Sequence, residues 1–176
     1  ETGEKEQSAA FENPQIFGGS NVLNRIDYDN NDESGYMRKI LIGHLNGEIK
    51  GMLDRNLIYE VVIAGNPTMR DIFFGLPVNT IGVKPFKSIT QHEKEDGERT
   101  STAITMSPRD VGIRMNSAGE VYGLPVIACH VGADTSAGVC VSQLCDAEKP
   151  SMLIDMGTNT EIVLGNKDRL IAASCP

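Results

Sequence analysis

Residues 152–166, MLIDMGTNTEIVLGN, decide the fold of this chain. An apolar strand ends in a carboxylate, Asp155, a Gly-Thr-Asn turn follows at once, and a second apolar strand leaves. Such a hairpin can hold phosphate, because Gly157 lets its N–H approach a ligand closely while Thr158 and Asn159 add short side-chain donors. Asp155 is then placed to hold Mg²⁺ through water or to orient an attacking water. The alternative is an ordinary tight hairpin with an aspartate in its turn.

The segment before the hairpin predicts a strand and then a helix of small residues. Residues 124–129 (LPVIAC) have the pattern of a strand, and residues 130–139 (HVGADTSAGV) begin a helix. Small side chains allow a helix to pack very close to another backbone, which would direct Asp134 at the helix start into a cleft. The order of strand, small-residue helix and hairpin resembles the actin, sugar-kinase and heat-shock-chaperone ATPase superfamily. The fold class expected from this resemblance is α/β, a ribonuclease-H-like or actin-like ATPase lobe with a mixed sheet flanked by helices.

The rest of the chain alternates between helix and strand patterns. Apolar residues spaced by three and four predict a long helix from Met37 to Leu53, with Arg38 and Asn46 on its solvated face. Asn66 and Pro67 are typical of a helix N-cap and first helical position. The other expected elements are strands at residues 4–11 and 59–64, a turn at 13–15, a short helix around 22–26 and a loop at 75–86.

Composition describes an ordinary globular protein. Hydrophobic residues make up 40% and charged residues 23% of the chain, and the formal net charge is -8. An acidic chain of this kind is not expected to bind nucleic acid or an anionic membrane surface. The N-terminal residues lack the apolar core of a signal peptide, so the expected location is the cytoplasm.

The four cysteines do not predict a disulfide framework or a metal site. They form no CxxC pair, and the three histidines have no ligand-like spacing. We therefore expect buried, reduced thiols and place His44 in the core or at its boundary. The cysteines are Cys129, Cys140, Cys145 and Cys175.

Several short motifs in a fixed order narrow the resemblance to one family. They closely resemble the ATPase domain of the reductive activators of corrinoid proteins, over nearly the whole chain and most weakly between about residues 84 and 116. The motifs are Asn-Pro-Gln at 13–15, Asn-Arg-Ile-Asp-Tyr at 24–28, Gly-Asn-Pro-Thr-Met at 65–69, Gly-Leu-Pro at 123–125, Val-Gly-Ala-Asp at 131–134, and Asp-Met-Gly-Thr-Asn with Glu-Ile-Val-Leu-Gly-Asn at 155–166.

The resemblance implies an ATP-dependent activase that returns the Co(II) corrinoid of a methyl-transfer protein to Co(I). Its cofactors would be ATP and Mg²⁺, its partner a corrinoid iron–sulfur protein, and its electron would come from an iron–sulfur cluster in a separate domain. Asp155 would serve Mg²⁺ or water as the catalytic residue, and Asp134 would approach the same metal. The nucleotide would contact Gly157, Thr158, Asn159 and Thr160 of the second phosphate loop and, by a weaker assignment, Asn66.

Departures from the family pattern predict an incomplete domain. Residues 1–176 read as a partial ATPase domain without its first phosphate loop, ending in the second phosphate hairpin at 152–173, with an exposed insertion at 87–118. Asn21, Asp71 and Thr160 stand where the family usually has Asp, His and Gly. We expect no measurable ATPase activity from this chain alone, and micromolar ATP affinity in calorimetry would contradict that expectation. Unpaired strand edges would favour a homodimer or aggregation.

Two other functions remain open on the sequence. One is a small-molecule kinase of the acetate or sugar type, which would use the same hairpin to transfer phosphate; the Asn-Pro-Gln and Gly-Asn-Pro-Thr-Met motifs argue against it. The other is a non-catalytic domain that docks a corrinoid protein through its acidic surface. A phosphorylated acceptor would favour the first, and ATP-independent capture of a corrinoid protein the second.

Overall fold

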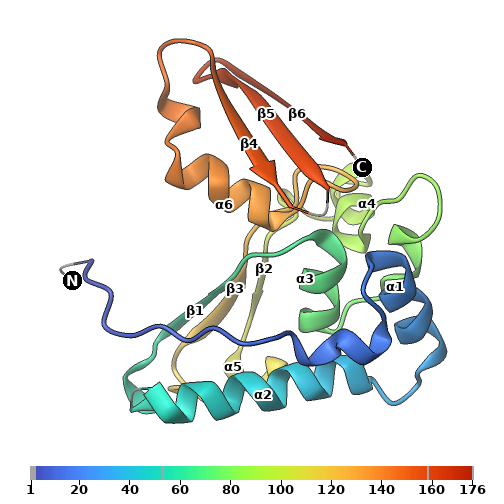
Figure 1. The fold of residues 1–176 in the computed structure, drawn as a ribbon, viewed down its shortest axis with the longest axis vertical. Coiled ribbons are helices and arrows are strands. Elements are labelled where there is room, and N and C mark those ends of the chain that lie inside the picture. Colours follow the sequence, from blue (N-terminus) through green and yellow to red (C-terminus); the bar gives the residue numbers. More distant parts are fainter. Residues whose placement is uncertain (1–2, 53, 158, 176) are drawn as a thin grey trace.

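The structure is a computed structural model that describes residues 3–52, 54–157 and 159–175. Helices flank two small three-stranded sheets, which confirms the expected α/β class but divides the strands between two sheets (Figure 1). The helices are α1 (Val22–Asn31), α2 (Tyr36–Met52), α3 (Pro67–Phe74), α4 (Ile89–Glu95), α5 (Pro108–Val111) and α6 (Ala133–Val141). Short 3-10 turns are η1 (Pro14–Gly18), η2 (Arg55–Leu57), η3 (Asn79–Ile81) and η4 (Leu144–Asp146).

The first sheet is mixed and has the order β1-β3-β2. Strand β1 (Glu60–Ile63) runs parallel to β3 (Glu120–Gly123), while β2 (Ile104–Met106) is antiparallel to it. The parallel pair needs a long crossover, which here contains α3 and α4. Strand β1, expected to be buried, is exposed at Glu60 and Val62 and half-buried at Val61 and Ile63, because only the latter two side chains face the core.

The main core lies between this sheet and helices α2 and α3. A smaller cluster joins α1, the start of α2, α3 and η3. Burial of these apolar faces is the main source of stability. The main core consists of Ile42, Phe73, Phe74, Ile104, Val111, Ile113, Met115 and Val121, and the smaller cluster of Ile26, Met37, Ile72, Val78 and Ile81.

Helix α2 confirms the long amphipathic helix predicted from its apolar spacing, up to Leu53, which lies outside the described residues. The prediction that Arg38 and Asn46 lie on a solvated face of this helix is partly wrong. Arg38 donates from Nε to the carbonyl of Phe73 at 2.9 Å and from Nη2 to that of Val111 at 2.8 Å. Asn46 donates to the carbonyl of Gly112 at 2.9 Å. Polar side chains on α2 therefore satisfy carbonyls at the C-terminal ends of α3 and α5, which have no partner within their own helix.

The second sheet is an antiparallel meander of β4 (Ser151–Met156), β5 (Thr160–Asn166) and β6 (Arg169–Cys175). The predicted hairpin is thus confirmed. Figure 1 shows this sheet above the first one, with α6 beside β4. Because side chains alternate along a strand, Leu153 points to α6 while Met152, Ile154 and Met156 lie on the opposite, exposed face.

Three expectations about exposure and pairing are wrong. Residues 4–11 run extended and exposed, with no strand assigned, because none of the described strands pairs with them (Figure 1). Residues 87–118, expected to form an exposed insertion, instead supply α4, β2 and α5 and bury Ile104, Val111 and Ile113. Of the cysteines expected to be buried, Cys129 is half-buried and the other three are exposed.

Among the described residues, no helix combines the length and the apolar character needed to cross a membrane.

Candidate functional site

Two chain segments meet where strands β1 and β3 of the first sheet end. The carbonyl of Gly65 accepts hydrogen bonds from the backbone N–H of Ala133 at 2.9 Å and of Asp134 at 3.3 Å. Gly132 makes this approach possible, since a Cβ atom there would lie 2.7 Å from the Cα of Asn66. Asn66 and Asp134, far apart in the sequence, therefore lie side by side at the starts of α3 and α6.

The side chains of Asn66 and Asp134 each accept one hydrogen bond from a backbone N–H at the start of their own helix. Asn66 is the N-cap of α3, as predicted, and its Oδ1 accepts from the N–H of Met69 at 2.9 Å. Asp134 is half-buried, and its Oδ1 accepts from the N–H of Thr135 at 2.8 Å. Its second oxygen, Oδ2, makes no hydrogen bond with a described residue and is free to bind a ligand. The helix starts are thus largely capped from within, which leaves few amide donors for an anion.

The hairpin tip places the remaining predicted residues in solvent. Asp155, Gly157 and Asn159 are exposed and Thr160 is half-buried; Thr158 lies outside the described residues. The N–H of Gly157 donates to the carbonyl of Asn159 at 2.9 Å, so this amide is already used within the turn. A Cβ at Gly157 would lie 3.5 Å from its nearest neighbour, and the backbone there is not left-handed. The special freedom expected of Gly157 is therefore not needed in this conformation.

Packing of α6 on β4 brings the two candidate carboxylates to the same end of the interface. A Cβ on Gly138 would lie 3.0 Å from Cδ2 of Leu153, so helix and strand pack closely at this contact. Asp134 lies one helical turn before Gly138, and Asp155 lies two residues after Leu153 on the same strand face. Figure 1 shows the end of β4 beside the start of α6. The side chain of Asp155 makes no hydrogen bond or ion pair with the described residues, whereas Asp134 already uses Oδ1 to accept from Thr135.

The carboxylate oxygens of Asp134 and Asp155 are suitable ligands for a hydrated Mg²⁺ ion. Mg²⁺ prefers oxygen ligands and commonly keeps several waters, so one or two carboxylates suffice. Asp134 and Asp155 supply such oxygens, whereas the described residues contain no group of three or more His, Cys, Asp or Glu side chains that could enclose a metal. The arrangement suits a hydrated metal held partly by a phosphate ligand rather than a cage made by the protein alone.

The predictions of a strand at residues 124–129 and of a helix start at residue 130 are wrong. Strand β3 ends at Gly123 and α6 begins at Ala133, with only an isolated bridge between Ala128 and Val131. Side chains take the place of a neighbouring strand. The donors are Arg70 Nη1 to Leu124 O (3.2 Å), Ser136 Oγ to Pro125 O (2.7 Å) and Thr102 Oγ1 to Val126 O (2.7 Å).

Arg70 and Asp71 form a fully buried ion pair next to the site, which sequence reasoning missed. Arg70 Nη2 lies 2.7 Å from Asp71 Oδ1, and both side chains are 0% exposed. The arginine also donates to Thr90 Oγ1 at 2.9 Å and to the carbonyl of Thr102 at 2.9 Å. Asp71 Oδ2 is buried without a partner among the described residues. Two adjacent charges inside an otherwise apolar helix, MRDIFF, were the sequence signal that could have revealed the pair.

Burial raises the pKa of Asp71 above its ordinary value of 3.8, against the opposing attraction of Arg70. A raised folded-state pKa means that the folded chain binds this proton more tightly than the unfolded chain. The stability associated with the protonated form is present at low pH and is lost as the pH rises above about 3.8.

We therefore expect the Asp71→Asn variant, which cannot ionise there, to gain stability relative to the unsubstituted chain as the pH rises from about 4 to 7. Urea unfolding at a series of pH values measures this difference. A difference that moves in the opposite direction would show that attraction to Arg70 outweighs burial. The exposed Asp168→Asn variant is the control for the effect of an aspartate-to-asparagine substitution on the surface.

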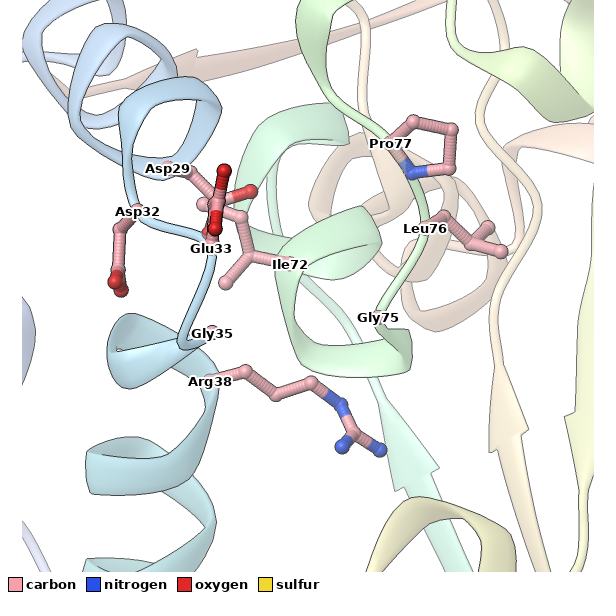
Figure 2. Close-up of a pocket in the computed structure, with 9 residues that line it drawn as sticks. All are labelled: Asp29, Asp32, Glu33, Gly35, Arg38, Ile72, Gly75, Leu76 and Pro77. Carbon is pink, nitrogen blue, oxygen red and sulfur yellow. The ribbon is translucent and has the colours of Figure 1, made fainter.

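Two cavities are lined by other residues than the candidate site residues Asn66, Asp134 and Asp155. One, of about 370 Å³, is lined by Arg55, Asn56, Arg114 and Met115. The other, of about 350 Å³, is shown in Figure 2: Asp29, Asp32 and Glu33 lie on one side, and Ile72, Leu76 and Pro77 line the other. Burial and the charge of Asp32 raise the pKa of Asp29, whereas a hydrogen bond from Ser34 lowers that of Asp32. Asp32 also accepts from the N–H of Tyr36 and so helps to start α2.

The fold and site together define a class of protein. A mixed α/β chain with two small sheets, in which a small-residue helix packs on a β-hairpin, has the architecture expected of one lobe of an actin-like ATPase. The chain belongs to the RACo family: residues 1–147 match the family model described as the RACo middle region. Residues 149–176 match the model described as the C-terminal domain of RACo, the ASKHA domain. The resemblance predicted from the sequence is confirmed.

Individual relatives agree with this assignment. The corrinoid activation enzyme RamQ of Eubacterium limosum is 32% identical over 92% of this chain and 26% of its own length. A [Co(II) methylated amine-specific corrinoid protein] reductase of Methanosarcina barkeri is 22% identical over 89% of this chain and 29% of its own length. A solved reductive activator for corrinoid, iron–sulfur protein superposes with a TM-score of 0.78 at 30% identity, over 93% of this chain and 26% of its own. The chain thus spans between a quarter and a third of these relatives.

Proposed function

We propose that this chain is part of an ATP-dependent reductive activator that returns the Co(II) corrinoid of a methyl-transfer protein to Co(I). The observation that carries the proposal is the position of Asp134 and Asp155 on the two elements that meet at the Gly138–Leu153 contact, in a chain of the RACo family. The names of its relatives, which refer to corrinoid activation and to a corrinoid protein reductase, support the same reaction. Reduction of Co(II) to Co(I) takes one electron, which an iron–sulfur centre in another domain would supply.

The residues of this chain would bind and orient rather than carry the electron. Asp155 and Oδ2 of Asp134 would hold Mg²⁺ directly or through water, and Asp155 would orient the attacking water. The phosphates would contact Gly157, Thr158, Asn159 and Thr160, and Asn66 would offer its Nδ2. ATP, when bound, supplies binding and hydrolysis energy for the uphill electron transfer. Asp134 and Asp155 are the two residues whose loss should matter most.

We further propose that the middle region and the start of the ASKHA domain act as one structural unit, as expected for residues 1–176. Contacts across the border at residue 148 support this proposal. Gly138 packs on Leu153, and the N–H of Lys167 donates to the carbonyl of Ala147 at 3.0 Å. The expected cytoplasmic location and the expected pairing of two copies through unpaired strand edges stay predictions; light scattering would test the second.

The proposal is tested with the intact protein, a corrinoid protein held as Co(II), titanium(III) citrate as electron donor, and ATP. Conversion to Co(I) is followed by its visible absorption. We expect Asp134→Asn and Asp155→Asn each to lower ATP-dependent conversion about 100-fold, because each removes a charge that stabilises the metal-bound phosphates.

Asp168→Asn is the matched control, since Asp168 is an exposed aspartate in the same sheet region whose loss should leave conversion unchanged. Conversion that does not depend on ATP would instead favour a docking domain. A phosphorylated small molecule formed without any change in the corrinoid would favour a kinase. Full activity of both aspartate variants would contradict the assigned roles.

A further inference from the structure

Three successive carbonyls after β3 are held by side chains from three separate parts of the chain. Residues 124–126 connect the first sheet to the segment that ends at Asp134. Their carbonyl oxygens accept from Arg70 of α3, Ser136 of α6 and Thr102 before β2, at 3.2, 2.7 and 2.7 Å respectively. Without these donors the three carbonyls would lack hydrogen-bond partners in the described structure. We call residues 124–126 the gripped segment.

Both helices that begin at the candidate site hold this segment. Arg70 lies one turn after Asn66 in α3, and Ser136 lies two residues after Asp134 in α6. The gripped segment therefore connects the two helix starts through side chains, in addition to the direct bonds from α6 to the Gly65 carbonyl. Thr102 is 5% exposed and Arg70 is 1% exposed, so water cannot easily replace either donor.

Arg70 is itself fixed in direction by its surroundings. Its Nη2 donates to Asp71 and to Thr90, and Nη1 donates to the carbonyl of Thr102 as well as to that of Leu124. A planar guanidinium with several fixed partners has little freedom to shift, unlike a lysine ammonium. Since Ser88 and Thr90 begin α4, the arginine also couples the position of α4 to the gripped segment.

We propose that Arg70, Thr102 and Ser136 are positioning residues that set the separation of Asn66 and Asp134 by holding the gripped segment. The inference rests on the proposed nucleotide and metal site. None of the three residues touches the proposed ligand, so they act on binding through geometry. Loss of one neutral hydrogen bond is worth roughly a 2- to 10-fold change in an equilibrium constant.

The test uses Thr102→Val and Ser136→Ala in the intact protein, because each deletes one donor and leaves the buried charges in place. We expect the KM for ATP to rise roughly 2- to 10-fold with kcat little changed. Thr102→Ser and Ser136→Thr, which restore a hydroxyl, should return the KM to its original value. Hydrogen–deuterium exchange is measured in parallel, and residues 131–135 should exchange faster in the two deletion variants.

Two controls separate positioning from general stability. Ser142→Ala removes another hydroxyl-to-carbonyl bond at the end of the same helix, 3.2 Å to Val139, and should change neither KM nor exchange at 131–135. Ile113→Val lowers core stability without touching the gripped segment and should leave the KM unchanged. If the unsubstituted protein does not hydrolyse ATP, the proposed function is contradicted. Hydrogen–deuterium exchange at residues 131–135 then decides alone whether the three residues position the site. Unaltered KM and exchange in both deletion variants overturn it.

Discussion

Replacing Gly132 by alanine is expected to lower ATP-dependent corrinoid reduction by about 100-fold, since a displacement of about 1 Å at a reacting centre can have an effect of this size. The added Cβ would lie 2.6 Å from Asp134 Oδ1, 2.7 Å from the Cα of Asn66 and 2.9 Å from the carbonyl oxygen of Gly65. Two of these neighbours are backbone atoms that no rotamer change can move. The segments carrying Asn66 and Asp134 must therefore separate.

The backbone conformation of Gly132 allows this substitution to test the close contact between the two segments alone. Its φ of -87° and ψ of -170° are open to alanine, so the substitution introduces a clash without backbone strain. Overpacking of this kind costs about 1–3 kcal/mol of stability. Activity is measured by corrinoid absorption and stability by urea unfolding.

Gly47→Ala is the matched control for Gly132→Ala. Gly47 lies in α2, where an added Cβ would meet no described atom within 4 Å outside its own helix. Alanine should therefore stabilise the helix by about 0.5–1 kcal/mol and leave activity unchanged. If Gly132→Ala retained the activity and stability of the unsubstituted protein, the close approach of the two segments would not matter for function.

The second large effect is expected from Arg70→Met, which should destabilise the chain by about 3–5 kcal/mol. The substitution leaves Asp71 buried and without its charged partner, and Asp71 Oδ2 already has no partner among the described residues. It also leaves the carbonyls of Thr102 and Leu124 without their donor. The free energy of unfolding in urea measures the loss.

Two further variants show whether the buried charge is the cause. The double variant Arg70→Met/Asp71→Leu removes both charges and should recover a large part of the lost stability. Arg99→Met breaks a half-exposed pair, in which Arg99 Nε lies 2.9 Å from Glu93 Oε2, and should cost less than about 1 kcal/mol. Equal losses in Arg70→Met and Arg99→Met would show that burial does not govern the cost.

Local signals in the sequence predicted the parts of the fold whose stability is local. The spacing of Met37 to Met52 predicted α2, and Asn66 with Pro67 predicted the start of α3, because caps and apolar stripes act over a few residues. The hairpin at 152–166 was equally clear, since its strands pair with each other. The local hairpin pattern also singled out Asp155, Gly157, Thr158 and Asn159 as candidate site residues, and the family motifs added the roles expected of Asp134 and Thr160. These roles stay predictions.

Contacts between residues distant in the sequence explain why the strands predicted at residues 124–129 and 4–11 are wrong. Residues 124–129 have the composition of a strand, but their first three carbonyls bind Arg70, Thr102 and Ser136, which are distant in the sequence. Residues 4–11 likewise have a strand pattern, yet none of the described strands pairs with them. A pattern indicates what a segment can form, whereas the available neighbours decide what it does form.

The contact between Gly138 and Leu153 has a consequence for motion. The helix and the strand touch where only a hydrogen occupies the glycine α-position, and this close packing couples their movements. A displacement of β4 is therefore expected to carry α6 in the same direction. Asp134 and Asp155, which are carried by these two elements, would then move together.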